Sequence, residues 1–253
     1  MKRSLYNLTD EPFAMFVNRV GKCLRDEKIE HNIVGGVAVQ AYMLKFLIRD
    51  RDIVSFLDNQ NVRIQDYLRN TDDVDISLNL QADDNEKRRK IEEILPQLEF
   101  EDISPTESYI VGVKMERRGV SRPTFRFYVN GNKESYEEIV SMNISRNQRG
   151  DLHKLDDSWN KEFLNQSTKI TIPYCRNFEL EVNVPTLEHL LASKISLSRA
   201  KDRMDIKNLS QAVKNSGIEL DFGRIEDVLL PYNEDDYCRF LQEEYPHELK
   251  RLA

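Results

Sequence analysis

The feature that most constrains this chain is an acidic strand motif at residues 71–76, with the sequence TDDVDI. Side chains alternate between the two faces of a strand, so Asp73 and Asp75 are expected on one face, with Val74 and Ile76 facing a core. Two neighbouring carboxylates repel each other at neutral pH unless a cation lies between them. Mg²⁺ takes oxygen ligands and leaves coordination places for phosphate oxygens. The motif therefore predicts a strand that carries a divalent metal site.

A glycine pair precedes the acidic motif. Residues 33–36 (IVGG) are expected to form a short apolar strand that ends on Gly35 and Gly36, and a helix is predicted from Val37 to Leu47. Glycines at a helix start leave backbone N–H groups open to a phosphate. A glycine pair alone is more often a simple turn, so the predicted phosphate site depends on its combination with the acids.

A second Asp-x-Asp pattern in the chain shows how weak that pattern is by itself. Asp50 and Asp52 flank Arg51 within a charged stretch. We expect this copy to be a solvated loop with no role in chemistry.

The glycine pair and the 71–76 motif together resemble the active-site signature of nucleotidyltransferases of the polymerase-beta type. Two later stretches, 190–194 (LLASK) and 199–205 (RAKDRMD), are similar to the branch that contains the AbiEii and AbiGii toxins. The match covers roughly half of the chain. It implies an α/β (α+β) nucleotidyltransferase fold, in which a mixed sheet flanked by helices is followed by a C-terminal helical portion.

The resemblance also implies a reaction. A nucleoside monophosphate would pass from a nucleoside triphosphate to an acceptor hydroxyl, with Mg²⁺ or Mn²⁺ holding the attacking and leaving oxygens. In the toxin branch the acceptor is an RNA, such as a tRNA, or a protein, so a toxin–antitoxin role with an antitoxin partner is implied. A small-molecule acceptor, as in antibiotic-modifying relatives, is the alternative within the enzymes.

The resemblance assigns catalytic roles to Asp73, Asp75 and Lys194, with both aspartates also as metal ligands. The nucleotide-binding candidates are Gly35, Gly36, Thr71, Lys194, Arg199, Lys201, Asp202 and Asp205.

Lys194 falls beside the apolar stripe of its predicted helix. It must therefore extend its ammonium group to the surface or meet a negative partner, which is either a nucleotide or a structural salt-bridge partner. In one unbroken helix, Lys201 and Asp205 would share the face of Lys194, and Arg199 would point away unless the chain bends near Ala200.

The resemblance places the third acid of the site at Asn143. Asparagine carries no charge and takes no proton at neutral pH. Glu179 and Glu181, on the polar face of a later strand, are possible substitutes, although an exposed sheet face is the commoner reason for such a pattern. A degenerate member that binds a nucleotide or a partner protein without turnover is therefore the alternative to an enzyme.

Composition limits the partners and the compartment. A net charge of −7 argues against a non-specific nucleic-acid coat, although the 37 Lys and Arg residues leave room for a local basic groove. Three scattered cysteines without zinc spacing favour a reducing cytosol. No apolar run approaches about 18 residues and no signal peptide is recognised, so we expect a cytoplasmic protein that does not enter a membrane.

The 253 residues are enough for one large domain or two small ones. We predict a nucleotidyltransferase α/β domain over 1–185, with an insertion near 49–69 that contains a short helix, and a C-terminal helical domain over 186–253. Further predicted helices span 10–28, 83–98, 187–199, 201–215, 224–230 and 235–249. Further predicted strands span 109–117, 124–129, 138–145, 169–175 and 178–184.

Overall fold

The computed structural model describes residues 7–49, 51–58, 67–71, 73–78, 110–117, 123–130, 136–146 and 166–252, together with residues 86, 89, 90 and 93. The isolated residues are helical and fall inside the predicted helix over 83–98, the rest of which lies outside the described residues.

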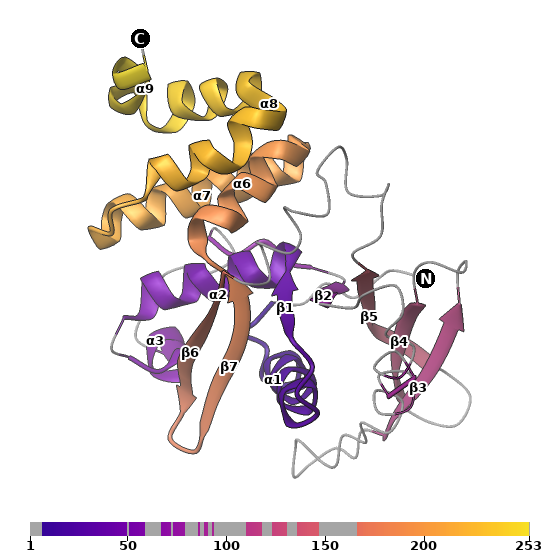
Figure 1. Cartoon of the computed structure of the whole chain (residues 1–253). Helices are drawn as coiled ribbons and strands as arrows, with labels where there is room; N and C mark the ends of the chain where they lie inside the picture. The colour runs from indigo at the N-terminus through magenta and orange to yellow at the C-terminus, as the bar shows by residue number, and fades with distance from the viewer. Residues whose placement is uncertain are drawn as a thin grey trace.

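The larger sheet has five strands in the order β1-β2-β5-β4-β3 (Figure 1). Strand β2 pairs in parallel with β5, and the β1–β2, β5–β4 and β4–β3 pairs are antiparallel, so the predicted mixed sheet is confirmed. Val74 and Ile76 of β2 are fully buried, as alternation along the strand predicts. The strand bounds are β1 His31–Val34, β2 Asp73–Leu78, β3 Ile110–Arg117, β4 Pro123–Asn130 and β5 Tyr136–Arg146.

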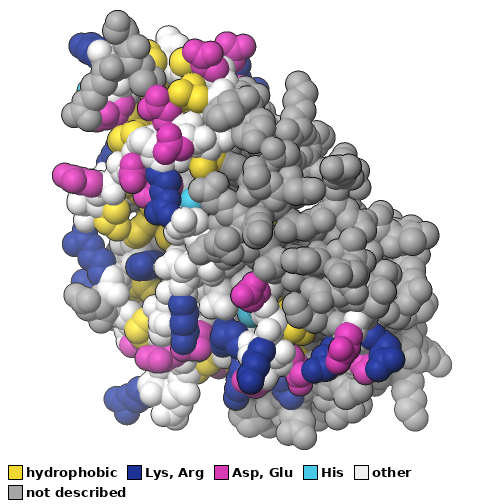
Figure 2. All heavy atoms as spheres, in the orientation of Figure 1, with side chains coloured by type: hydrophobic (Ala, Val, Ile, Leu, Met, Phe, Trp, Pro, Cys, Tyr) yellow, Lys and Arg dark blue, Asp and Glu magenta, His cyan; other side chains and the backbone are white. Residues whose placement is uncertain are grey.

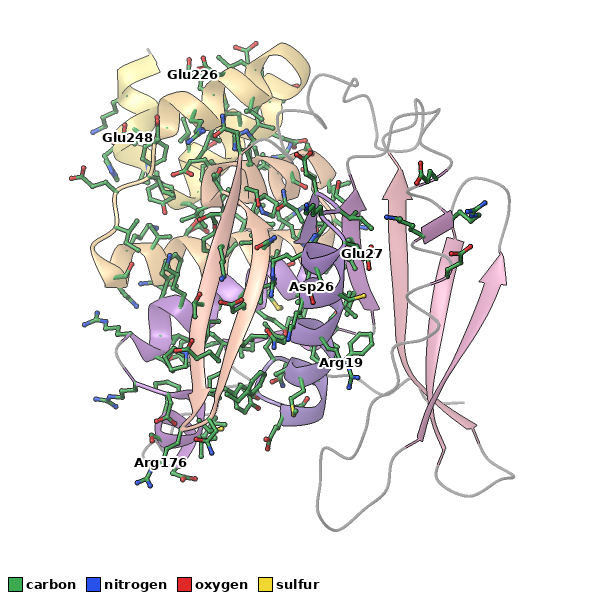
Figure 3. All side chains as sticks on the ribbon, turned by 60° about the horizontal axis from the view of Figure 1, so that its bottom comes forward. Arg19, Asp26, Glu27, Arg176, Glu226 and Glu248 are labelled. Atoms are coloured by element: carbon green, nitrogen blue, oxygen red, sulfur yellow. The ribbon has the colours of Figure 1, made fainter. Side chains whose placement is uncertain are left out.

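A second sheet is the hairpin of β6 (Ser167–Cys175) and β7 (Phe178–Pro185). Its buried residues are apolar and alternate along each strand with partly or fully exposed residues. Strand β7 packs on β1 and on the helix α1 (Glu11–Asp26), and β6 packs on the short helix α3 (Ile53–Asp58). Figure 3 shows α1 beside this hairpin, with Arg19, Asp26 and Glu27 labelled on the helix.

Helix α2 (Gly35–Ile48) is the central helix of the fold. It contacts β2 and β6 on the sheet side and α7 (Ala200–Ser216) on the other side. Its residues are apolar on almost every face, as expected for a helix with partners on both sides. The helix begins at the glycine pair itself, earlier than the predicted start at Val37.

The C-terminal part consists of α6 (Leu187–Leu197), α7, α8 (Phe222–Glu244) and α9 (Pro246–Leu252). Gly217, with φ of 70°, ends α7 as a left-handed cap. The prediction of two helices over 224–230 and 235–249 was wrong, because α8 continues through Pro231. Proline inside a helix costs about 3 kcal/mol, and here the burial of apolar residues along both halves of α8 offsets that cost.

The buried apolar residues of the sheets, α2 and the C-terminal helices belong to one contiguous cluster. The expected division near Pro185 coincides with the end of β7, and the two-domain organisation stays a prediction. None of the helices in the described part of the chain is long and apolar enough to cross a membrane.

Candidate active site

The start of α2 lies against the carboxylate of Asp75. Strand pairing places Asp75 opposite Val34, the residue that precedes the helix. A Cβ atom on Gly35 would lie 2.5 Å from Oδ2 of Asp75, and Gly35 has a positive φ of 68°. Only glycine fits there without strain. A negative charge at a helix N-terminus is favourable, so this position suits the Asp75 carboxylate.

Gly36 also lies close to its neighbours, in the segment that leads into β2. A Cβ atom on Gly36 would lie 3.0 Å from Nη2 of Arg69 and 3.1 Å from Oγ1 of Thr71. Thr71 is buried. Four of the predicted site residues, namely Gly35, Gly36, Thr71 and Asp75, are therefore brought together at the start of α2.

Lys194 lies in the interior between α6 and α7. Its Nζ donates to Oδ1 of Asp202 at 3.1 Å and to Oδ2 of Asp205 at 2.8 Å. The three side chains are only 4%, 0% and 2% exposed, respectively. A buried ammonium group needs such partners, because an uncompensated charge in the interior is costly. In this structure, the contacts of Lys194 are those of a buried salt bridge.

An arginine extends the salt bridge at each end. Arg199 donates from Nε to Oδ2 of Asp202 at 2.5 Å. Arg69 donates to Asp205 from Nε at 3.1 Å and from Nη2 at 3.3 Å. We call Arg199, Asp202, Lys194, Asp205 and Arg69 the ion network. Its middle is buried, whereas the side chains of Arg199 and Arg69 are 52% and 26% exposed.

A break between α6 and α7 makes this arrangement possible. Ser198 adopts the left-handed conformation, with φ of 49°, and α7 begins at Ala200. The chain thus bends where the sequence allowed a bend, and Asp202 joins Asp205 in facing Lys194. Lys201 is exposed, and the structure does not place it in the ion network.

The charges in the ion network shift the pKa values of Asp202 and Arg199, and the charge of Asp75 contributes to the shift of Arg199. Burial alone would raise the pKa of Asp202, but hydrogen bonds and positive charge from Arg199 and Lys194 hold that pKa below its usual value. The hydrogen bond to Asp202 raises the pKa of Arg199, and the negative charges of Asp202, Asp75 and Asp205 raise it further. The Asp75 carboxylate and the ion network are therefore within electrostatic range of each other.

Strand register brings Asn143 next to Asp75. In the parallel β2–β5 pair, Asp75 is aligned with Asn143 and Asp73 with Ser141. The predicted position of the third acid is therefore the neighbouring position on the sheet, and it is held by an uncharged residue.

Glu181 is engaged elsewhere. It forms ion pairs with Lys169 of β6 and with Arg25 of α1, the latter at 3.2 Å. Glu179 is exposed on the same strand. These positions match the exposed-face interpretation of both glutamates rather than a substitute third acid.

The second Asp-x-Asp copy has a structural role at its described residues. Asp52 accepts hydrogen bonds from the backbone N–H of Ser55 at 2.7 Å and from its hydroxyl at 2.8 Å. These contacts cap α3. Asp50 lies outside the described residues.

Two residues of this site are not predicted from the sequence. Arg69 was assigned to an insertion, although it lies two residues before Thr71, a spacing that puts both on one side of an extended segment. Gln40 of α2 is also buried, and it donates to the Arg69 carbonyl at 2.7 Å while accepting from the Leu8 N–H at 2.9 Å. Gln40 thereby fixes the segment that carries Arg69.

The described residues contain no group of three or more histidine, cysteine, aspartate or glutamate side chains that could hold a metal ion. The Asp75 carboxylate is a hard oxygen donor of the kind that Mg²⁺ prefers. The side chain of Asp73 lies outside the description. Figure 2 shows acidic and basic side chains interspersed over the described part of one face.

Comparison with known proteins gives only distant likenesses, to solved structures. No protein-family model and no curated protein sequence matches the chain. Among solved structures, JHP933 from Helicobacter pylori is 13% identical, with a TM-score of 0.41 over 98% of this chain and 83% of that one. A proposed nucleotidyltransferase from H. pylori is 10% identical, with a TM-score of 0.40 over 96% of each chain. At these TM-scores neither likeness carries an argument.

Proposed function

We propose that this chain is a Mg²⁺-dependent nucleotidyltransferase that transfers a nucleoside monophosphate from a nucleoside triphosphate to an acceptor hydroxyl. One observation carries the proposal: the Asp75 carboxylate lies against the bare Cα of Gly35, and Arg69, which is paired with Asp205, lies against Gly36. Two motifs that are far apart in the sequence thus meet at one place. Carboxylates for a metal and cations for phosphates are both needed for transfer at a phosphorus atom.

Each group would have a distinct role. Asp73 and Asp75 would hold Mg²⁺ or Mn²⁺, which when bound neutralises the charge that develops on the phosphate oxygens. The positive end of α2, which begins at Gly35, would favour the phosphates. Arg199 supplies a fixed positive charge. Lys194, held by two carboxylates, keeps Asp202 and Asp205 in place.

The class of acceptor is proposed from the resemblance of the 199–205 segment to the AbiEii and AbiGii toxins. That resemblance favours an RNA, including a tRNA, or a protein as acceptor, and a toxin–antitoxin role with an antitoxin as partner. Transfer to a small molecule is the competing outcome.

A nucleotide-binding protein without turnover is the second candidate. The observation that favours it is the alignment of Asn143 with Asp75 on the neighbouring strand. A site that lacks the third carboxylate loses one metal ligand or base, so it could bind a metal–nucleotide complex without catalysing transfer.

The test is incubation of the protein with each α-labelled nucleoside triphosphate and Mg²⁺, in the presence of total RNA, protein extract or small hydroxyl compounds. Covalent labelling of one acceptor class supports the enzyme. Binding of the labelled nucleotide without any transfer supports the second candidate, and the absence of both binding and transfer contradicts both. Asn143→Asp should raise the rate if the missing carboxylate limits turnover.

A further inference from the structure

Arg69 is a cation of this site whose guanidinium has more hydrogen-bond donors than its contacts with the described residues use. Among the described residues its guanidinium donates to Asp205 from Nε and Nη2, and from Nη1 to the Asn70 carbonyl at 3.2 Å. An arginine has five N–H donors, so these contacts leave N–H groups for another acceptor. The side chain is 26% exposed, which allows that acceptor to come from solvent.

The guanidinium of Arg69 lies at the start of α2. Its Nη2 atom lies 3.0 Å from the point where a Cβ atom of Gly36 would be. The adjoining residue, Gly35, makes the corresponding close approach to Oδ2 of Asp75. The guanidinium of Arg69 and the carboxylate of Asp75 therefore flank the two successive glycines that open the helix.

The ion network fixes two arginines and leaves a surplus of positive charge. It contains Arg199, Lys194 and Arg69 against two carboxylates, Asp202 and Asp205. Lys194 is too deeply buried to meet a ligand without losing its two partners, whereas the arginines at the ends are partly exposed. Arginine held in place by a carboxylate is well suited to a phosphate, since its planar fork is already oriented.

We infer that Arg69 is a further ligand for the phosphates of the nucleotide, and that Arg69 and Arg199 act as a pair whose positions are set by the Asp205–Lys194–Asp202 salt bridge. The inference rests on the proposed function, because it takes a nucleoside triphosphate as the ligand. An arginine that contacts phosphate adds affinity without regard to the base. Lys194 is on this view a positioning residue.

Arg69→Gln tests the inference, with Arg25→Gln as the matched control. Arg25 is also 26% exposed and is likewise paired with one carboxylate, that of Glu181. It lies on α1 beside β7, near His31 at the far end of β1 from Gly35. Removing Arg69 leaves Asp205 paired with Lys194, so the fold should be retained. The probes are the four nucleoside triphosphates and inorganic tripolyphosphate, each with Mg²⁺, measured by calorimetry, and the melting temperature reports folding.

Arg69→Gln should lower the affinity of the protein for all five probes by about 10- to 100-fold. Arg25→Gln should leave these affinities unchanged. Arg69→Lys keeps the positive charge but not the planar guanidinium, and its affinity for the probes should fall by less than about 10-fold. This variant also provides the test if the glutamine variant fails to fold. Unchanged affinity in folded Arg69 variants, or a loss confined to nucleotides and absent with tripolyphosphate, overturns the inference. If the wild-type protein binds none of the probes, the proposed function is contradicted as well. If wild type and variant bind the probes equally well, only the assignment of Arg69 as a phosphate ligand is contradicted.

Discussion

The carboxylate of Asp75 occupies the space that a side chain on Gly35 would need, with Oδ2 only 2.5 Å from the position of that absent Cβ atom. This contact joins the acidic strand to the start of the central helix. It also explains the glycine in physical terms, because both the positive φ and the lack of room exclude larger residues.

Gly35→Ala should therefore destabilise the protein more than a glycine-to-alanine substitution at a position where the only cost is the positive φ. Gly217→Ala is the matched control, since Gly217 has a φ of 70° but nothing within 4 Å of its added Cβ atom. We expect a loss of about 1–2 kcal/mol at Gly217 and a further 1–3 kcal/mol at Gly35 from the clash with Asp75. Urea unfolding measures both. Equal losses would mean that the Gly35–Asp75 contact does not constrain the helix start.

Lys194→Met should lower the free energy of unfolding by about 3–5 kcal/mol, because Asp202 and Asp205 lose the cation buried between them. Lys214→Met, which removes a partly exposed ion pair with Glu244 at 3.4 Å, should cost less than about 1 kcal/mol. Both are read from denaturant unfolding curves. The opposite pattern, in which Lys194→Met keeps its stability and loses only nucleotide affinity, would make Lys194 a direct ligand and not a structural ion.

His189 should make stability depend on pH. Burial, with a smaller contribution from the positive charge of Arg224, lowers the pKa of His189 to about 4. In the unfolded chain the imidazole takes up a proton near its ordinary pKa of about 6.5, while the folded imidazole stays neutral until about pH 4. Protons therefore favour the unfolded state across this window, and stability falls by about 3 kcal/mol as the pH drops from 6.5 to 4.

The comparison of wild type with His189→Gln checks this dependence, using the free energy of unfolding at several pH values. The variant should lose most of the slope between pH 6.5 and 4. An unchanged slope would place its origin in other groups. Asp202, whose pKa is held low, stabilises the fold above its ordinary pKa and loses that contribution only as the pH falls further, so the two effects are separable.

Much of the local structure around the site could be predicted from the sequence. Alternation predicted the buried face of β2, with Val74 and Ile76 inside. The glycine pair predicted the central helix, although its start was placed at Val37 and not at Gly35. Gly217 marked the end of α7 correctly. These signals are local, because one residue type or a short period determines each of them.

The remaining features depend on contacts between distant segments. Nothing near Lys194 in sequence reveals that Arg69 shares Asp205 with it, since 136 positions separate Arg69 from that aspartate. The continuation of α8 through Pro231 likewise reflects packing that outweighs a local preference. Both errors arose where tertiary contacts determine the outcome.

The most direct test of the active site is to compare Mg²⁺-dependent transfer of labelled nucleotide by the Asp75→Asn and Asp52→Asn proteins. Each variant removes one negative charge, and asparagine can replace Asp52 as the cap of α3. We predict a loss of at least about 100-fold for Asp75→Asn, as expected when one electrostatic stabiliser is removed, and wild-type activity for Asp52→Asn. Full activity in a folded Asp75→Asn protein would contradict the assignment of the active site.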